Sequence, residues 1–366
     1  MRFALKECRW RSVGDELVVV FDPRESITLE DSEGQIAVLL ASLRDQSQSV
    51  PELRASLAAG GVDVSEEDLG RGIEGLAGLG LIEPAEGRST GDPAVDERHF
   101  SNLTFFGTFS GPGQTRRDLL ERVRNAHVLV LGVGGGGSAV VQCLAGLGVG
   151  ELTLLDHDRV ESRNFARQFV YRQEDIGRSK VDRAAAWVRA YDPEIKVRTV
   201  DRWVAGPADL ADLTGGIDVI SGGLDGHPDV GLWMNEAAVR AGVPLVGGGA
   251  SRTLMTYYSV DPGVSSCLAC ERSERAEEGS TGQAAEAVIR DLRITNPLIG
   301  PVSMHTGSLM ALEVLRYLTR FQEPVAAGRR HVIDLLDGMA REVTPFPEVP
   351  GCPVCALAPA RRARRD

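Results

Sequence analysis

Residues 132–138 form a glycine-rich loop that could bind phosphate. They read Gly-Val-Gly-Gly-Gly-Gly-Ser and follow the apolar run 128–131, which is typical of a buried parallel strand. Glycines let the backbone approach a phosphate, and the free N–H groups that open the following helix favour an anion. Asp156 ends the next apolar run, where a ribose hydroxyl would be held. On these features alone, a nicotinamide or flavin dinucleotide fits as well as ATP does. The candidate nucleotide-binding residues are Gly132, Gly134, Gly135, Gly136, Gly137, Ser138 and Asp156.

A second group of polar residues follows Asp156 and favours a triphosphate. It contains a second acid, two amides, a guanidinium and an ammonium. Arginine is always charged and can donate to two phosphate oxygens at once, whereas lysine acts as a point charge beside a phosphate. Cations so close to a phosphate loop suit ATP better than an adenine dinucleotide. The residues concerned are Asp158, Asn164, Arg167, Gln168 and Lys180.

The two motifs together resemble the ubiquitin-activating-like adenylating enzymes. The glycine loop reads G-x-G-G-x-G-S, and the second motif reads D-x-D-x-V-x-x-x-N-x-x-R-Q. The resemblance covers about residues 98–355 and includes the activators of the molybdopterin and thiamin sulfur carriers and the adenylating enzyme of microcin C. It implies that ATP is used to adenylate a carboxylate.

The resemblance also implies a role for each matching residue. Asp156 would hold the ribose. Asn164, Arg167 and Lys180 would line the phosphates, with Gln168 in support. Asp225, which follows a predicted strand at 217–220, matches the acid that binds Mg²⁺ in the family. A carboxylate at the carboxyl end of a parallel strand is well placed to hold Mg²⁺ against phosphates, although a turn residue before glycine is the alternative.

A homodimer is a further implication of the resemblance. In the family, an arginine near the start of the domain often reaches the nucleotide site of the partner subunit. This sequence has Ser101 at that position, so Arg98 or another arginine would have to substitute. The arginine that would act across the dimer is therefore not identified.

Two cysteine pairs predict a structural zinc site. Each pair has the spacing C-x-x-C, and four thiolates make a closed tetrahedral Zn²⁺ site that leaves no position for catalysis. The resemblance supports the same arrangement. The predicted ligands are Cys267, Cys270, Cys352 and Cys355.

The loop after the first cysteine pair lacks the nucleophile that many relatives carry there. The stretch 271–289 contains no cysteine, and we expect Cys143 to belong to the core. The sequence thus predicts adenylation without an enzyme-bound thioester. Another nucleophile, such as an amide, an amine, a sulfur donor or a downstream enzyme, would intercept the acyl-adenylate.

Residues 1–85 differ in pattern from the rest of the chain. Two β-rich runs, 16–21 and 26–29, precede three short amphipathic helices, which is typical of a winged-helix-like α+β module. The module resembles the peptide-recognition element of enzymes that modify ribosomally made peptides. That resemblance implies that a leader peptide adds as a strand beside residues 26–29, against the helix face 68–76. A structural or dimerisation module is the alternative.

The expected fold is an α/β protein in three parts. Residues 1–85 form the module, residues 86–97 a polar linker, and residues 98–366 a doubly wound, mostly parallel Rossmann-like adenylation domain with the zinc site. Helices are expected near 138–147, 178–191 and 229–241.

Composition excludes several classes of protein. The 366 residues carry a formal net charge of −12, so the molecule should repel nucleic acid and anionic membranes. No apolar run reaches the roughly 18 residues of a membrane helix, and no signal peptide is apparent. We expect a cytoplasmic protein that binds neither nucleic acid nor membrane.

The predicted function is the ATP-dependent adenylation of a carboxylate on a ribosomally made precursor peptide. ATP, Mg²⁺ and structural Zn²⁺ are the expected cofactors. One alternative is an activator of the C-terminal glycine of a ubiquitin-like sulfur carrier. Two others are a non-catalytic protein that delivers a precursor peptide to a cyclising enzyme, and a nicotinamide-dependent oxidoreductase.

Overall fold

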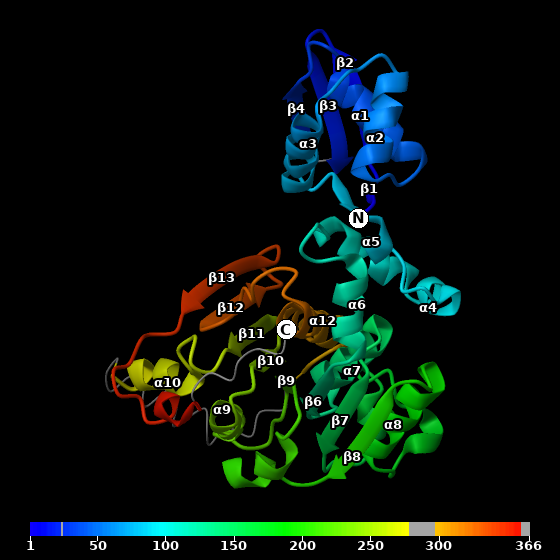
Figure 1. Cartoon of the computed structure of the whole chain (residues 1–366). Helices are drawn as coiled ribbons and strands as arrows, with labels where there is room; N and C mark the ends of the chain where they lie inside the picture. The colour runs from blue at the N-terminus through cyan, green and yellow to red at the C-terminus, as the bar shows by residue number, and fades with distance from the viewer. Residues whose placement is uncertain (23–24, 278–296, 360–366) are drawn as a thin grey trace. The chain divides into compact units, whose positions relative to one another are not determined.

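The computed structural model describes residues 1–22, 25–277 and 297–359 (Figure 1). The chain divides into two compact units, Met1–Glu121 and Arg122–Asp366. The segment expected to be a linker, 86–97, lies in the first unit and contains part of a 3₁₀ turn and most of a short helix. The predicted boundaries and roles of the module, the linker and the adenylation domain stay predictions.

The first unit contains two small antiparallel sheets and a set of helices. Strands β1 (Phe3–Leu5) and β5 (Ile82–Pro84) pair with each other. Strands β2 (Arg9–Val13), β3 (Glu16–Asp22) and β4 (Glu25–Glu30) form a second sheet in that order, so β4 is an edge strand. The helices are α1 (Gln35–Asp45), α2 (Val50–Ala59), α3 (Glu66–Gly78), α4 (Pro93–Arg98) and α5 (Phe100–Phe109), with a 3₁₀ turn η1 at Ala85–Gly87.

Local capping explains where these helices begin. The Ser65 hydroxyl accepts the N–H of Asp68 at the start of α3, and both Asp31 carboxylate oxygens accept N–H groups in the first turn of α1. The apolar faces of the helices then pack on β3, whose Leu17 and Val19 are fully buried. The predicted hairpin and three helices are confirmed, and β2 adds a strand that the sequence did not predict.

The second unit is built on an eight-stranded mixed sheet. Its order is β13-β12-β11-β10-β9-β6-β7-β8, and the five strands from β10 to β8 run parallel. The parallel strands are β6 (His127–Leu131), β7 (Glu151–Asp156), β8 (Lys196–Asp201), β9 (Val219–Gly222) and β10 (Leu245–Ser251). Strands β11 (Leu254–Val260), β12 (Arg329–Asp334) and β13 (Ala340–Pro345) extend the sheet antiparallel. The predicted doubly wound, mostly parallel sheet is confirmed.

Helices cover both faces of this sheet. Helices α7 (Gly135–Leu147), α8 (Lys180–Tyr191) and α12 (Gly300–Thr319) pack together on one face. Helix α9 (Val230–Ala241) and the 3₁₀ segment η4 (Pro207–Leu213) pack on the other, against a core of β-strand leucines and isoleucine. Helix α10 (Leu268–Glu277) contacts α9, and helix α6 (Arg116–Arg124) precedes β6.

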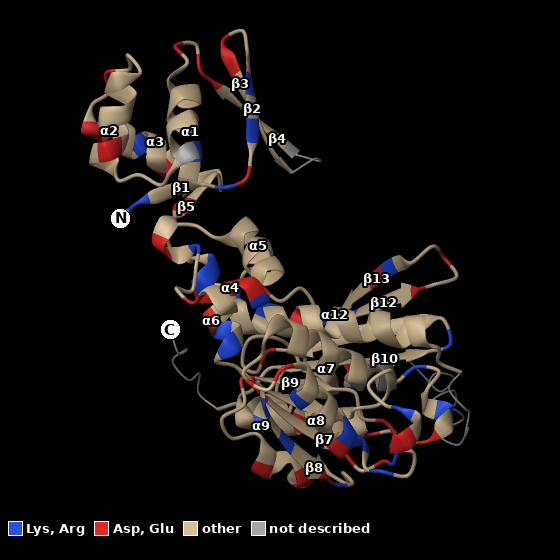
Figure 2. Ribbon diagram, turned by 90° about the vertical axis from the view of Figure 1, so that its right-hand side faces the viewer, with Lys and Arg blue, Asp and Glu red and all other residues tan. Residues whose placement is uncertain are grey.

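The surface of the protein mixes both signs of charge. In the ribbon of Figure 2, acidic and basic residues are both scattered over the described elements of the two units. Within the described residues, no helix combines the length and apolar character that a membrane span requires.

Candidate functional site

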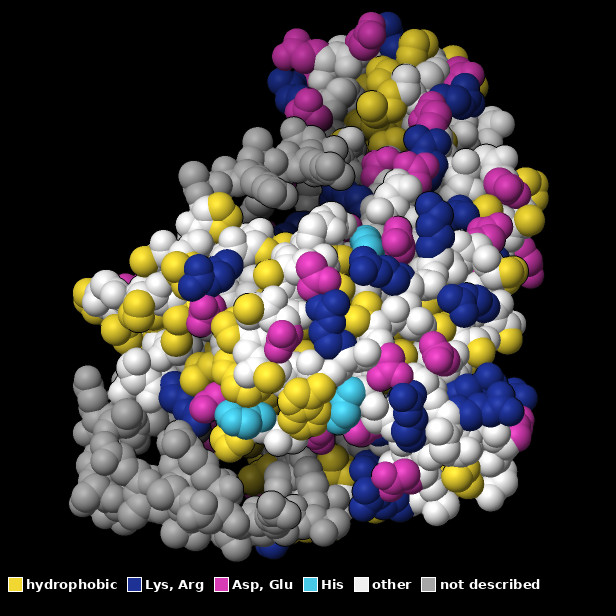
Figure 3. Space-filling view, turned by 90° about the horizontal axis from the view of Figure 1, so that it is seen from below, with side chains coloured by type: hydrophobic (Ala, Val, Ile, Leu, Met, Phe, Trp, Pro, Cys, Tyr) yellow, Lys and Arg dark blue, Asp and Glu magenta, His cyan; other side chains and the backbone are white. Residues whose placement is uncertain are grey.

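Most of the predicted site residues lie at or just after the carboxyl ends of the parallel strands. The glycine loop follows β6, Asp156 ends β7, and Asp225 follows β9, and these strands are neighbours in the sheet. Figure 3 looks onto the end of the molecule where the parallel arrows of Figure 1 point. In α/β proteins this edge of the sheet is where ligands bind.

Two glycines of the loop are required by backbone packing. Gly132 has a φ of 90°, and a Cβ there would lie 2.9 Å from the carbonyl oxygen of Gly223. A Cβ on Gly137 would lie 1.8 Å from the Gly132 carbonyl oxygen, so helix α7 starts directly against the strand. Close packing at these two glycines shapes the loop, and their predicted contact with the nucleotide stays a prediction.

Backbone N–H groups at the start of α7 are accessible to a ligand. A Cβ on Gly136 would meet nothing within 4 Å, so the space beside this residue is open. Gly134 is the N-cap of α7, and no described side chain caps the helix. The first turn of a 13-residue helix therefore presents uncapped N–H groups, which suit a phosphate.

Two buried polar atoms beside the loop lack a hydrogen-bond partner among the residues that the structure describes. They are Oε1 of Gln168 and Oγ of Ser303. The Ser303 hydroxyl would lie 2.7 Å from a Cβ on Gly135, and the amide nitrogen of Gln168 would lie 3.8 Å from a Cβ on Gly134. Buried polar groups are normally paired, so unpaired ones around an anion-binding turn fit a polar ligand.

Asp156 joins the strand end to the loop. One carboxylate oxygen accepts the Val133 N–H at 2.9 Å, and the other accepts the Asp158 N–H at 2.9 Å. The buried carboxylate is therefore held in place by backbone donors on both sides. Each oxygen keeps a second lone pair for a ribose hydroxyl.

The two predicted cations have different environments. The ammonium of Lys180 is buried and donates to the carboxylate of Asp158 at 2.8 Å. Arg167 lies beside the loop, with its Cδ 3.4 Å from a Cβ on Gly135. Across the described ranges Arg167 forms no ion pair, and its guanidinium makes only a long contact of 3.5 Å with the Arg163 carbonyl oxygen.

Asn164 and Ser138 have structural partners. The Asn164 Oδ1 accepts the Glu161 N–H at 2.8 Å, and its carbonyl oxygen accepts the N–H groups of Arg167 and Gln168. Asn164 thus holds the turn that carries the next two predicted residues. The buried Ser138 hydroxyl donates to the Gly135 carbonyl oxygen. Their predicted contacts with phosphate stay predictions.

Asp225 lies within electrostatic range of the other site residues. Burial of the Asp225 side chain raises the pKa of its carboxyl. The negative charge of Asp158 raises it further, and Asp156 makes a smaller contribution in the same direction. The positive charges of Lys180 and Arg167 act in the opposite direction. A carboxylate crowded by acids gains from a divalent cation, so the donors here fit the hard-oxygen preference of Mg²⁺.

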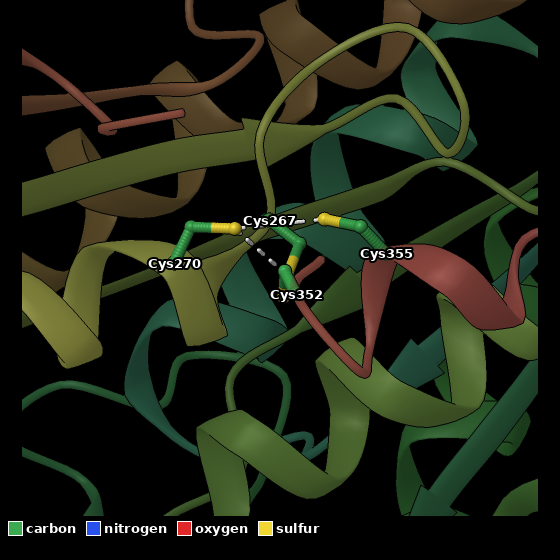
Figure 4. A group of neighbouring side chains, drawn as sticks. All are labelled: Cys267, Cys270, Cys352 and Cys355. Carbon is green, nitrogen blue, oxygen red and sulfur yellow. Dashed lines mark hydrogen bonds between the residues drawn. The ribbon is translucent and has the colours of Figure 1, made fainter. Parts of the chain in front are cut away.

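The four predicted cysteines come together beside α9 and α10 (Figure 4). The Sγ atoms of Cys267 and Cys270 are 3.9 Å apart, those of Cys267 and Cys352 are 3.9 Å apart, and those of Cys270 and Cys355 are 3.5 Å apart. A tetrahedral Zn²⁺ with bonds of about 2.3 Å spaces its sulfurs by about 3.8 Å. The cluster fits zinc, and the bound metal stays a prediction.

Some residues around the site were not predicted from the sequence. The Tyr171 hydroxyl donates to the Val133 carbonyl oxygen at 2.7 Å, and this hydrogen bond holds the glycine loop in place. Ser303 lies in the first turn of α12, which begins at Gly300. The Gly300-Pro301 pair is a helix-start signal that could have placed that turn correctly.

Sequence relatives of the chain are adenylating enzymes. SAMP-activating enzyme E1 of Haloferax volcanii is 31% identical over 234 residues, which are 64% of this chain and 82% of the relative. Molybdopterin-synthase adenylyltransferase of Salmonella typhimurium is 32% identical over 240 residues, which are 64% of this chain and 89% of the relative.

Solved structures with the same fold extend over more of the chain. The crystal structure of E. coli MccB with ATP has a TM-score of 0.78 and 21% identity, and the match covers 97% of this chain and 100% of that chain. The crystal structure of PaaA has a TM-score of 0.66 and 22% identity, and the match covers 81% of this chain and 96% of that chain.

The family model of the ThiF family matches residues 109–354, which include the glycine loop, the second motif and the first three cysteines. This match spans more than half of the chain and agrees with the chemistry assembled at the strand ends. The chain therefore belongs to the ThiF family and is an enzyme that activates carboxylates with ATP.

Proposed function

We propose that this enzyme adenylates a carboxylate of a ribosomally made precursor peptide. A carboxylate oxygen of the peptide attacks the α-phosphorus of ATP, and the bond to the bridging oxygen of pyrophosphate breaks. The products are an acyl-adenylate and pyrophosphate.

The residues at the strand ends supply positioning and charge neutralisation for this step. The uncapped N–H groups of α7, with Arg167 and Lys180, lie where phosphate charge would be neutralised. Asp156 is held by two backbone donors and is available to a ribose hydroxyl. Asp225 would hold Mg²⁺, which supplies further neutralisation of the phosphates when it is bound.

The observation that carries the peptide assignment is the exposed edge of β4. Among the described residues this strand pairs with β3 and has no partner on its other side. Leu29 on β4 packs on the same core as Leu69 and Ile73 of α3. An edge strand offers unpaired backbone groups to an extended peptide, and neighbouring side chains select its sequence. The N-terminal module therefore has the features of a peptide-docking site.

The extent of the comparisons supports the same choice. The E. coli MccB structures match nearly the whole chain, and one of them contains N-formylated MccA. The family model begins only at residue 109. The N-terminal module therefore lies outside the domain that the family shares, which fits a role in choosing the substrate.

Neither described cysteine outside the metal cluster is suited to form a thioester. Burial raises the pKa of the Cys143 thiol, and burial also raises the pKa of the Cys8 thiol, although Arg9 and Arg44 lower it. A thiol with a raised pKa is a weak nucleophile at neutral pH. The crossover stretch 271–289 has no cysteine, although part of it lies outside the described residues. We therefore infer that a separate nucleophile intercepts the adenylate.

ATP–[³²P]pyrophosphate exchange by the full-length enzyme tests the proposal. The substrates to compare are peptides encoded beside the gene and a ubiquitin-like carrier that ends in Gly-Gly. Exchange with a peptide alone supports the proposal. Exchange with the carrier alone replaces it with sulfur-carrier activation, the activity named for the molybdopterin-synthase relatives. Absence of exchange with either, despite ATP binding, would contradict both assignments.

A further inference from the structure

An exposed tryptophan lies immediately beyond the carboxyl end of β8. Trp203 is 51% exposed, although large aromatic side chains usually bury most of their surface. The preceding residue is fixed, because the Arg202 guanidinium donates to the Asp212 carboxylate at 2.7 and 3.0 Å and to the Asp209 carbonyl oxygen. The backbone therefore holds the indole at a defined place on the surface.

The indole of Trp203 contacts both neighbouring parts of the candidate site. The ring of His157, which follows β7, is edge-on to it with centroids 4.4 Å apart. On the other side, a Cβ on Gly226 would lie 3.5 Å from the far end of the indole. Figure 3 shows histidine side chains next to hydrophobic groups on this face. Trp203 thus lies between the ribose-holding strand end and the turn after Asp225.

The order of strands places a nucleotide base near this residue. The phosphate loop follows β6, the ribose acid ends β7, and β8 is the next strand in the sheet. Neighbouring strands are about 4.8 Å apart, which is close to the spacing between successive parts of a nucleotide. Phosphates at β6 and ribose at β7 therefore direct the base toward the end of β8.

We propose that Trp203 provides the stacking surface for the purine base of ATP, with His157 holding the indole in place. The inference rests on the proposed function, because it requires ATP at the glycine loop. Aromatic side chains stack on bases with little dependence on their hydrogen-bonding edges. The exposed surface of the Trp203 indole is then the surface that the base covers.

Calorimetric titration with two ligands separates contact with the base from a general effect on the site. ATP and tripolyphosphate, both with MgCl₂, are titrated into the full-length enzyme and into Trp203→Leu, Trp203→Phe and Trp187→Leu. Trp187 is a matched control, because it stacks on Tyr191 within α8 with centroids 5.1 Å apart and takes no part in the site. Thermal unfolding of each variant verifies that it is folded.

We expect Trp203→Leu to weaken ATP binding about tenfold, to leave tripolyphosphate binding unchanged, and to be largely rescued by Trp203→Phe. The Trp187→Leu variant should bind both ligands as the wild type does. An equal loss for both ligands, unchanged ATP affinity, or tighter ATP binding would each overturn the stacking role. A wild-type enzyme that binds tripolyphosphate but not ATP would also overturn it, and one that binds neither would remove the proposed function as well.

Discussion

Asp156 connects three parts of the candidate site through one carboxylate. It ends β7, accepts the N–H of Val133 in the glycine loop, and accepts the N–H of Asp158. Asp158 in turn binds the ammonium of Lys180. A change at Asp156 should therefore disturb both the ribose position and the loop.

Substitution of Asp156 by alanine should weaken ATP binding at least about tenfold and abolish pyrophosphate exchange. Hydrogen bonds to charged groups contribute about 1.5–3 kcal/mol each, and three of them depend on this carboxylate if the ribose binds there. Calorimetric titration and exchange assays provide the measurements. Asp201→Ala is the matched control, since Asp201 pairs with Asp156 in register at the end of β8 and its carboxylate binds the exposed Arg159. Full exchange activity in Asp156→Ala would refute the site assignment.

Asp225→Asn should make the nucleotide-free protein more stable at pH 7 while removing exchange activity. The pKa of Asp225 is raised by burial and by Asp158, so its ionised form is less stable in the folded than in the unfolded protein. The resulting loss of stability is absent below the ordinary pKa of aspartate, about 3.9, and grows as the pH rises through the raised folded value.

Melting temperatures of wild type and Asp225→Asn, measured from pH 4 to pH 8, check this prediction. The difference should be largest at neutral pH and shrink toward pH 4. A less stable Asn variant at pH 7 would show that the Asp225 carboxylate is favourably placed without a cation. Addition of MgCl₂ and ATP should raise the melting temperature of the wild type only.

The sequence predicted those site residues that belong to continuous motifs. Asp156, Arg167 and Lys180 follow the glycine loop closely in the chain, and the topology of one βαβ unit brings them together. Ser303 could not be found this way, because its position beside Gly135 depends on the packing of α12 against α7. The exposed position of Trp203 likewise depends on the tertiary contacts of the loop after β8.

Among the secondary-structure elements, buried strands could be predicted from their apolar sequences, whereas exposed strands could not. Strand β6 carries a continuous apolar run, and β7 is mostly leucine with one buried threonine, because both faces of these strands are covered. Strands β2 (Arg-Trp-Arg-Ser-Val) and β13 (Ala-Arg-Glu-Val-Thr-Pro) are largely exposed and carry charged residues, so their sequences give no comparable signal. Tertiary pairing rather than local propensity places these strands.

Binding of the correct precursor peptide should protect the amide hydrogens of β4 from exchange with deuterium. An added strand forms backbone hydrogen bonds with an edge, which slows exchange at alternate residues. Hydrogen–deuterium exchange with and without the peptide measures the effect, and β13 at the edge of the large sheet is the internal control. Protection of β13 instead of β4 would move the proposed peptide site to the second unit.

Removal of zinc should destabilise the second unit without changing the residues of the nucleotide site. The cysteine cluster joins the start of α10 to the segment after β13, next to α9. Elemental analysis should give about one zinc per chain for the wild type and none for Cys352→Ser, because four thiolates form one closed site. Melting temperature should fall in Cys352→Ser and after chelation, and Cys8→Ser should keep its zinc. A metal-free wild type with the same stability would argue against a structural metal.

At the scale of the whole molecule, each of the two units has its own interior. In the first, Glu83 on β5 is almost completely buried and binds the guanidinium of Arg116, with Arg88 and the Ser110 hydroxyl as further partners. These partners come from segments before and after α5. The cluster therefore fastens the small β1–β5 sheet to α6 and to the chain on both sides of α5.

Glu83→Ala should lower the free energy of unfolding by about 3–5 kcal/mol, the usual effect of removing one partner of a buried ion pair. Chemical denaturation of the full-length chain, followed by circular dichroism, measures it. Glu67→Ala is the control, since the Glu67–Arg71 pair on α3 is exposed and should contribute little. A small effect of Glu83→Ala would indicate that water solvates the arginines once the carboxylate is gone.

The cysteine cluster also changes how the second unit would respond to a cut in its backbone. Cys270 and Cys352 bracket α12, β12 and β13, so a metal held by both pairs would close the intervening chain into a ring. Hydrolysis of any single peptide bond inside that ring would leave two fragments cross-linked through four sulfur–metal bonds. Such a nicked enzyme should migrate as one particle in gel filtration and separate only when denaturant is combined with a chelator, much as disulfide-linked fragments separate only after reduction.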